Sequence, residues 1–331
     1  MISIAHIGHG YWGKNLARNF HELGHLAAVV DPDAKAAEAA AKAYGVRALT
    51  FEQALADPAL DAVSLASPAG LHYRHAKAAL EAGKHVYVEK PLALDIGEAE
   101  ALCALAKARG RVLMVGHLLQ YHPVYVKLRQ MVEAGELGRL FHIYSNRLSL
   151  GKFRTEENVL WSFAPHDISM ILGLAGEEAV DVTAQGTVAF TPGVADLVSA
   201  QMRFAGGARA HVLVSWMHPF KEQRLVVIGE KGMAVFEDSQ PAWEDKLILY
   251  RHAVDTSGPV PNPVKVDGQK IEVARAEPLK EECLHFIRCI ETGASPITDG
   301  SEGLAVLRVL DAAERALTEN LNAQTRAGEA A

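Results

Sequence analysis

Residues 2–24 read ISIAHIGHGYWGKNLARNFHELG, and this stretch decides the class of fold. Its first six residues are mostly apolar, as in a short buried strand. Further along, Leu16, Phe20 and Leu23 recur at helical spacing, and Gly24 supplies a stop signal. The residues between strand and helix read GHGYWG. The order of a strand, a glycine-rich turn and a helix predicts the opening of a nucleotide-binding α/β domain.

The turn itself, residues 8–13, has the GxGxxG pattern of dinucleotide-binding domains. Gly8 would permit a tight turn, and Gly10 would let a pyrophosphate approach the backbone. Gly13 would let the helix pack closely against the strand, with its positive N-terminal end facing the phosphates. A glycine turn with a purely structural role is the alternative.

Asp31 lies 18 positions after Gly13, at the end of the second predicted strand, where a carboxylate can bind the adenosine ribose. Asp33 follows, and the first basic residue beyond it is Lys35, so a 2′-phosphate would meet two carboxylates. This favours NAD over NADP. The alternative role for Asp31 is to cap the next helix. The cofactor contacts predicted in this part of the chain are Gly8, Gly10, Tyr11, Trp12, Gly13, Asp31 and Ser67.

Strand-like and helix-like segments alternate as far as His117, which is typical of βαβ units and a parallel sheet. We therefore expect residues 1–118 to form a Rossmann domain. Short strand-like runs dominate from about residue 180 to 271, and two helices follow. For residues 119–331 this predicts an α+β domain with an open, mainly antiparallel sheet, whose C-terminal helices can pack back on the first domain. A second subunit could cover the open sheet, so we expect a homodimer or homotetramer.

Composition excludes several classes of partner. The chain has 331 residues, 49% of them hydrophobic, and a formal net charge of −7, which disfavours nucleic acid and anionic membranes. Cys103, Cys283 and Cys289 have neither zinc-site nor disulfide-framework spacing, and no metal is expected. The N-terminus lacks the features of a signal peptide, and no apolar run approaches a membrane span. A cytoplasmic protein is the expectation.

Two further motifs accompany the glycine turn: the triplet Glu89-Lys90-Pro91 after a predicted strand, and LWSFAPHDIS at residues 160–169. Together the three resemble the glucose–fructose oxidoreductase and inositol dehydrogenase (Gfo/Idh/MocA) superfamily over essentially the full length. The resemblance implies that Glu89, Lys90 and Pro91 contact the cofactor, with Lys90 beside the nicotinamide and the substrate hydroxyl. It also implies that the prolyl bond is often cis and that His166 belongs to the active site.

Longer segments look like those of sugar-nucleotide 3-dehydrogenases within this superfamily, among them VGHLLQYHPVYVKL and VSWMHPFKEQRLVVIGEKGMAVFED. That likeness implies oxidation of the C3 hydroxyl of UDP-N-acetylglucosamine for a partner aminotransferase, in the synthesis of a diamino sugar of lipid A. Three alternatives stay open: the C6 carboxylate form of this sugar nucleotide, a free sugar or inositol, and a non-catalytic NAD-binding sensor.

Oxidation of a secondary alcohol needs a hydride acceptor and a base for the hydroxyl proton. His166 suits the base because imidazole titrates near neutrality, whereas a lysine would need burial or a nearby positive charge. We expect Lys90 to stabilise the developing alkoxide and His166 to accept the proton, although the roles could be exchanged. Many superfamily members have Asp four residues before this histidine, but here that residue is Ser162. An Asp–His pair is therefore not expected.

A sugar nucleotide also needs cations for its diphosphate, preferably planar ones. Arg147, Lys152 and Arg154 lie close together in NRLSLGKFRTEEN, and a solvated loop is the alternative reading of this run. Asp167 is predicted to bind a substrate hydroxyl or to cap a helix. The remaining substrate-binding candidates are Tyr121, His122 and Trp161, although such aromatic residues are more often part of a core.

Overall fold

The structure, a computed structural model, describes residues 1–329, with side chains described as far as Ala323. The chain forms two compact units, which we describe separately. Unit 1 comprises Met1–Tyr121 and Ala276–Leu307, and unit 2 comprises His122–Arg275 and the chain from Arg308 onward. The sequence placed one boundary at residues 118 and 119. In the structure the chain instead enters unit 2 at His122, returns to unit 1 at Ala276 and leaves it again after Leu307. Residues 330–331 of the second predicted domain lie outside the described residues.

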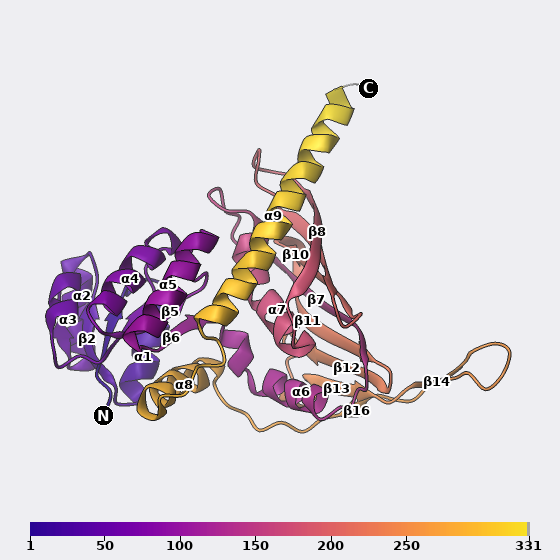
Figure 1. Ribbon diagram of the computed structural model, residues 1–331, viewed down its shortest axis with the longest axis horizontal. Helices are drawn as coiled ribbons and strands as arrows, with labels where there is room; N and C mark the ends of the chain where they lie inside the picture. Colours follow the sequence, from indigo (N-terminus) through magenta and orange to yellow (C-terminus); the bar gives the residue numbers. More distant parts are fainter. Residues whose placement is uncertain (330–331) are drawn as a thin grey trace. The chain divides into compact units, whose positions relative to one another are not determined.

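Unit 1 contains a six-stranded sheet in which all pairings are parallel, as the alternation of strands and helices predicted (Figure 1). Its strand order is β3 (Arg47–Ala48), β2 (Leu26–Val30), β1 (Ile4–Ile7), β4 (Ala62–Leu65), β5 (His85–Glu89) and β6 (Leu113–Gly116). The four residues of β1 are all buried, as are those of β4 and β6, because helices cover a parallel sheet on both faces. The order reverses next to β1, and ligands of such sheets bind at the carboxyl ends of strands near a reversal.

The helices of unit 1 are α1 (Gly13–Glu22), α2 (Ala34–Tyr44), α3 (Phe51–Ala56), α4 (His72–Glu81), α5 (Ile96–Arg109) and α8 (Pro278–Thr292), with the short helices η1 (Ala69–Leu71) and η2 (Leu118–Tyr121). Helix α8 comes from the far end of the sequence and completes the core of this unit. Its Leu279 and Phe286 belong to the same buried cluster as Leu16 and Phe20 of α1 and Tyr87 of β5.

Unit 2 contains an eight-stranded mixed sheet, in which β7 and β10 pair in parallel and the other pairings are antiparallel. Its strand order is β16 (Gln269–Lys270), β13 (Leu247–Tyr250), β12 (Gly232–Glu237), β11 (Met217–Gly229), β7 (Leu140–Leu150), β10 (Arg209–Ser215), β9 (Leu197–Phe204) and β8 (Ala179–Thr187). The expected mainly antiparallel sheet is thus confirmed, with one parallel pair that the sequence did not predict.

Two helices, α6 (Pro123–Glu133) and α7 (Val159–Ala175), pack against this sheet, and the short helix η3 (Trp243–Asp245) precedes β13. The exposed hairpin β14 (Ala253–Asp255) and β15 (Asn262–Val264) extends from the end of β13 (Figure 1). Helix α9 (Gly300–Glu329) begins in unit 1 and continues into unit 2. Among the described residues, no helix combines the length and the apolar composition needed to cross a membrane.

Candidate active site

The glycine turn connects β1 to α1, and each of its three glycines meets a different steric demand. Gly8 has a φ of +91°, and a Cβ on it would lie 2.7 Å from the carbonyl oxygen of Ala66. A Cβ on Gly13 would lie 1.8 Å from the carbonyl oxygen of Gly8, because the start of α1 packs directly against the turn. Around Gly10, in contrast, nothing lies within 4 Å of a Cβ. Gly8 and Gly13 therefore permit the close packing within the turn, while Gly10 leaves the outer side of the turn open to a ligand.

The first turn of α1 is also open to an anion. Trp12 occupies the N-cap position and makes no side-chain capping hydrogen bond. Backbone N–H groups at an uncapped helix start can donate to phosphate oxygens, and the helix dipole favours the negative charge. The neighbouring Tyr11 side chain is 88% exposed, so it can contact a bound dinucleotide without moving out of a core.

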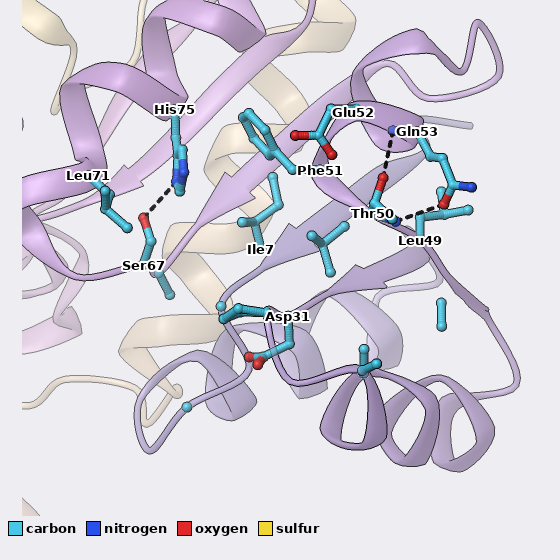
Figure 2. Close-up of a pocket in the computed structure, with 18 of the residues that line it drawn as sticks. Ile7, Asp31, Leu49, Thr50, Phe51, Glu52, Gln53, Ser67, Leu71 and His75 are labelled. Carbon is cyan, nitrogen blue, oxygen red and sulfur yellow. Dashed lines mark hydrogen bonds between the residues drawn. The ribbon is translucent and has the colours of Figure 1, made fainter.

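A pocket of about 920 Å³ lies beside the glycine turn and is lined by Gly8, Gly10, Asp31 and Ser67, among others (Figure 2). Asp31 follows β2, and its carboxylate accepts hydrogen bonds from the backbone N–H groups of His9 (2.7 Å) and Asp33 (3.0 Å). The N-cap of α2 is Asp33, which accepts hydrogen bonds from the N–H groups of Lys35 and Ala36. The capping role considered for Asp31 therefore belongs to Asp33, and Asp31 lines the pocket.

The same pocket has lining residues that the sequence did not single out. Figure 2 shows Ser67 hydrogen-bonded to His75, at 3.1 Å between Ser67 Oγ and Nδ1, with Phe51 on the neighbouring helix α3. The rings of Phe51 and His75 lie 4.6 Å apart, and Leu49 and Leu71 add further apolar lining. A mostly apolar pocket with the Asp31 carboxylate beside an open glycine turn fits the adenosine half of a nicotinamide dinucleotide.

The triplet Glu89-Lys90-Pro91 ends β5, and its peptide bond between Lys90 and Pro91 is cis. The side chain of Glu89 is buried and accepts a hydrogen bond of 2.5 Å from Trp12 Nε1. Burial raises the pKa of Glu89, and the Trp12 hydrogen bond and the charge of Lys90 oppose that shift. The carbonyl oxygen of Pro91 lies 2.7 Å from His72 Nδ1 on α4. These contacts fix the triplet relative to the glycine turn. Lys90, which is half-buried, therefore follows β5 directly after the fixed carboxylate of Glu89.

In unit 2, helix α7 carries the segment that contains His166. Asn158 caps the helix and accepts hydrogen bonds from the N–H groups of Leu160 and Trp161. His166 is half-buried, and Ser162 lies one helical turn before it on the same face. A serine hydroxyl cannot supply the carboxylate that many superfamily members have at that position. Because consecutive helical residues point about 100° apart, Asp167 faces a different direction from His166.

Asp167 points toward β7, where its carboxylate is enclosed by two side chains. It is 1% exposed, and its Oδ2 lies 2.5 Å from Arg147 Nε. Ser145 donates a second hydrogen bond of 2.5 Å to Oδ1. The sequence predicted a substrate contact or a helix cap for Asp167 and a phosphate contact for Arg147. The structure places both residues in an ion pair between α7 and β7.

The two other cations of that run lie beyond the end of β7. Lys152 and Arg154 are exposed on the loop that follows the strand, and Arg154 Nη1 lies 3.1 Å from Glu157 Oε1. The three cations therefore do not form one cluster, because Arg147 is turned toward α7 and the other two face solvent. Lys152 and Arg154 remain available to a charged ligand.

The aromatic candidates are packed into the interior or bonded to protein groups. Tyr121 in unit 1 is 5% exposed, and its hydroxyl lies 2.9 Å from Thr298 Oγ1. His122 in unit 2 is 4% exposed and caps α6, with its Nδ1 accepting a hydrogen bond from the N–H of Val124. Trp161 is half-buried and donates to Glu314 Oε2 at 3.1 Å. In this structure Tyr121 and His122 stabilise their own units.

Another buried residue of unit 1, Glu282 on α8, contacts the same network as the triplet. The hydroxyl of Tyr87 lies 2.9 Å from Glu282 Oε2 and 3.3 Å from Glu89 Oε1. The signal in the sequence is a glutamate at helical spacing with Leu279 and Phe286, on an otherwise apolar face. Within the described part of the chain, no group of three His, Cys, Asp or Glu side chains is placed to hold a metal ion.

Known protein families match both halves of the chain. Residues 2–117 match the oxidoreductase family with an NAD-binding Rossmann fold, and residues 125–235 match the GFO/IDH/MocA C-terminal domain. The protein therefore belongs to the Gfo/Idh/MocA family of oxidoreductases, and unit 1 contains its nicotinamide-dinucleotide-binding domain.

Individual relatives extend this match across nearly the whole chain. UDP-N-acetylglucosamine 3-dehydrogenase of Acidithiobacillus ferrooxidans is 32% identical over 303 residues, covering 91% of this chain and 92% of that protein. The solved structure of that enzyme gives a TM-score of 0.85 at 29% identity, covering 97% of this chain and 98% of that one. Inositol 2-dehydrogenase of Rhizobium meliloti is 28% identical over 305 residues, 89% of each protein. The similarity thus extends to enzymes for two different kinds of substrate.

Proposed function

We propose that this protein is an NAD-dependent dehydrogenase that oxidises the C3 hydroxyl of UDP-N-acetylglucosamine to the 3-keto sugar nucleotide. The observation that carries the proposal is the 32% identity to UDP-N-acetylglucosamine 3-dehydrogenase over 91% of the chain. That identity includes the cofactor domain and the second unit, which in this proposal binds the sugar nucleotide.

NAD rather than NADP is proposed because of the charge beside the adenosine pocket. Asp31 lines the pocket and Asp33 follows it at the start of α2. A 2′-phosphate would face the carboxylate of Asp31, whereas the hydroxyls of an unmodified ribose can donate hydrogen bonds to it. A higher affinity for NAD than for NADP in direct titrations would support this assignment, and the reverse order would contradict it.

In the proposed reaction the chain supplies a donor and a base. When bound, NAD would supply the acceptor for a hydride from the C3 carbon of the sugar. The Lys90 ammonium donates a hydrogen bond to the C3 oxygen as negative charge develops there. His166 accepts the proton of that hydroxyl, since imidazole is the side chain best suited to general base catalysis at neutral pH. Ser162, one helical turn before His166, is a serine and supplies no carboxylate from that position.

For the diphosphate we propose Lys152 and Arg154, which are exposed on the loop after β7. Arg147 is not included because it is bound to Asp167. Replacing both loop cations with alanine is expected to raise the KM for a UDP-sugar and to leave the affinity for NAD unchanged. An unchanged KM would remove the loop from the substrate site.

Two alternative substrates define the comparison. The 28% identity to inositol 2-dehydrogenase over 89% of the chain favours a free polyol as the second candidate, and the C6 carboxylate form of the sugar nucleotide is the third. A neutral polyol has no need of Lys152 and Arg154, so the double alanine variant separates the two classes of substrate.

We further propose that the 3-keto product is consumed by an aminotransferase, as in the synthesis of diamino sugars for lipid A.

We also propose that the enzyme is a homodimer or homotetramer. Ser145 faces α7, so its neighbour Tyr144 lies on the opposite face of the sheet. There Tyr144 lines a pocket of about 530 Å³ that combines apolar residues such as Val235 and Ile248 with charged residues such as Arg224 and Glu237. A second copy would bury this mixed surface. Light scattering that shows a monomer at micromolar concentration would contradict the oligomer.

The deciding experiment is reduced-nicotinamide absorbance after mixing the protein with NAD and each candidate: UDP-N-acetylglucosamine, its C6 carboxylate form, UDP-glucose and myo-inositol. An aminotransferase with its amino donor is included so that an unfavourable equilibrium does not hide the reaction. Lys90→Ala is expected to abolish turnover and retain NAD binding, and Lys77→Ala, which removes an exposed lysine of α4, is the matched control. Turnover with inositol alone would overturn the proposed substrate, and an unaltered rate in Lys90→Ala would overturn the role of Lys90.

A further inference from the structure

Two carboxyl groups from distant parts of the sequence lie together in the core of unit 1. Glu89 ends β5 and is 9% exposed, while Glu282 on α8 is fully buried. The hydroxyl of Tyr87 lies between them, 2.9 Å from Glu282 Oε2 and 3.3 Å from Glu89 Oε1. The resemblance to the superfamily gives Glu89 a place at the cofactor, whereas Glu282 has no role in the proposed reaction.

The surroundings of Glu282 are unfavourable to a negative charge. Helix α8 buries it on the face that also carries Leu279, Cys283 and Phe286, all members of the hydrophobic core. An ionised carboxylate among apolar side chains loses its hydration and regains little of that free energy from its neighbours. Burial raises the pKa of Glu282 well above the ordinary value.

The titratable groups that face Glu282 add to this effect. The carboxylate of Glu89 on β5 and that of Glu302 on α9 both raise the pKa of Glu282, and the Tyr87 hydrogen bond opposes them. Glu302 itself lies against His117, with Oε2 and Nδ1 2.5 Å apart. The charges around Glu282 are thus carboxylates on two neighbouring elements, which disfavour a third negative charge between them.

A count of hydrogens leads to the same state. Tyr87 has one hydroxyl hydrogen, which cannot serve both carboxyl groups. Glu89 also receives the indole N–H of Trp12 at 2.5 Å, so it has a donor of its own. Glu282 Oε1 has no hydrogen-bond partner among the described residues. A proton on Glu282 can be donated to Tyr87 Oη, and the Tyr87 hydrogen is then free to point at Glu89.

We propose that Glu282 is protonated at neutral pH and donates to Tyr87, which in turn donates to an ionised Glu89. In this directed chain Glu282 is a positioning residue that acts through Tyr87. It keeps Glu89 in position to accept the hydrogen bond from Trp12 of the glycine turn. Glu89 is the last residue of β5, and Lys90 follows it. The consequence for turnover rests on the proposed function, but the protonation and its effect on NAD binding do not depend on the substrate.

The packing of β6 gives independent support for the placement of the hydrogen-bonded groups of Glu282, Tyr87 and Glu89. Gly116 lies opposite Glu89 in the register of β5 and β6. A Cβ on Gly116 would lie 2.8 Å from Tyr87 Oη and 3.0 Å from Glu89 Oε2. Any larger residue would therefore displace one of the two groups, and only glycine leaves the hydrogen-bonded chain undisturbed.

Infrared spectroscopy of the full-length protein at neutral pH tests the protonation directly. A protonated carboxyl group has a carbonyl band that is distinct from those of ionised carboxylates. We expect this band in the wild type, its loss in Glu282→Gln, and its retention in Glu291→Gln, which changes an exposed glutamate of the same helix. No band in the wild type, or a band that persists in Glu282→Gln, would overturn the proposal.

Titration with NAD at a series of pH values tests the positioning role. Tyr87→Phe removes the hydroxyl that donates to Glu89, and Glu282→Leu removes the donor that orients this hydroxyl. In both variants the carboxylate of Glu89 is less well stabilised and its pKa rises. We expect roughly tenfold weaker NAD binding and a shift of the acidic limb of the affinity profile by about one pH unit to higher pH. Glu282→Gln, whose amide can donate to Tyr87, should retain the wild-type limb.

The remaining outcomes are also decisive. A loss of affinity that is equal at every pH would indicate general damage to the fold and overturn the positioning role. The same conclusion would follow if Glu282→Gln shifted the limb as far as Glu282→Leu. If the wild type did not bind NAD at all, the proposed function and the positioning role would both fail, and the infrared band would still decide the protonation of Glu282.

Discussion

Replacing Arg147 with methionine should destabilise unit 2 strongly, because it would leave the carboxylate of Asp167 buried without its ion-pair partner. The Asp167 side chain is 1% exposed and that of Arg147 is 13% exposed, and Arg147 Nε lies 2.5 Å from Asp167 Oδ2. After the change, Ser145 would still donate to Asp167. Removing one partner of a buried pair typically costs about 3–5 kcal/mol, so a loss near the lower end of this range is expected.

The chain offers a matched control on the loop that follows β7. Arg154 and Glu157 also form an ion pair, but their side chains are 49% and 37% exposed. Arg154→Met should therefore reduce the free energy of unfolding by about 1 kcal/mol or less. The double variant Arg147→Met, Asp167→Asn removes both charges and should recover much of the loss, because no unpaired charge remains in the interior.

Urea unfolding at neutral pH, followed by tryptophan fluorescence, measures these differences. Of the four tryptophans, Trp161, Trp216 and Trp243 lie in unit 2, so the signal reports mainly on that unit. If Arg147→Met cost no more than Arg154→Met, the ion pair would not stabilise the fold. In that case Arg147 would again be a candidate for binding the substrate diphosphate.

Four other substitutions test features of unit 1. Gly10→Ala should leave stability unchanged and abolish dinucleotide binding in NAD titrations, since its Cβ would project into open space. Gly13→Ala should lower both the stability and the affinity for NAD, because its Cβ would overlap the turn. Equal effects of the two substitutions would contradict this distinction. The pKa of His6 is lowered from 6.5 to about 3, chiefly by burial. As the pH falls, the unfolded chain therefore binds a proton at His6 before the folded protein does. The contribution of His6 to the free energy of unfolding is complete above pH 6.5 and should decrease as the pH drops toward 3, by about 1.4 kcal/mol per pH unit. His6→Gln should flatten this slope in urea unfolding, and an unchanged slope would point to other groups. Lys84→Met should cost about 1–3 kcal/mol, because Nζ donates to two backbone carbonyls at 2.7 Å each, and a neutral result would show that water replaces it.

The features that the sequence predicted well are those set by short stretches of chain. The glycine turn, the strands and the helices of residues 1–118 depend on local periodicity and on where glycines stand, so the parallel sheet could be predicted. Asp31 could be placed at the pocket because it follows β2 directly. The family motif at Glu89-Lys90-Pro91 identified a strand end whose cis bond and buried carboxylate the structure then showed.

The features that were missed depend on contacts between distant segments. Arg147 looked like a neighbour of Lys152 and Arg154, but it lies within β7, where alternation turns it toward α7 and Asp167. The amphipathic pattern of α8 showed that one face is buried and could not show which unit buries it, so Glu282 was not associated with Glu89. Likewise, short strand-like runs do not reveal strand order, and the parallel pairing of β7 with β10 could not be predicted.

The discontinuous construction of unit 1 has a consequence for synthesis on the ribosome. Residues 1–121 emerge first, but α8, which packs with α1 and β5, ends at Thr292. At bacterial or eukaryotic elongation speeds, the intervening chain takes roughly 10–30 s to synthesise. Throughout that interval Phe20 and Tyr87 lack the side chains of α8 that complete their cluster, and the whole eight-stranded sheet of unit 2 is made meanwhile. The Rossmann unit is therefore the first part of this protein to be translated, and yet it cannot finish folding until most of the chain has been made.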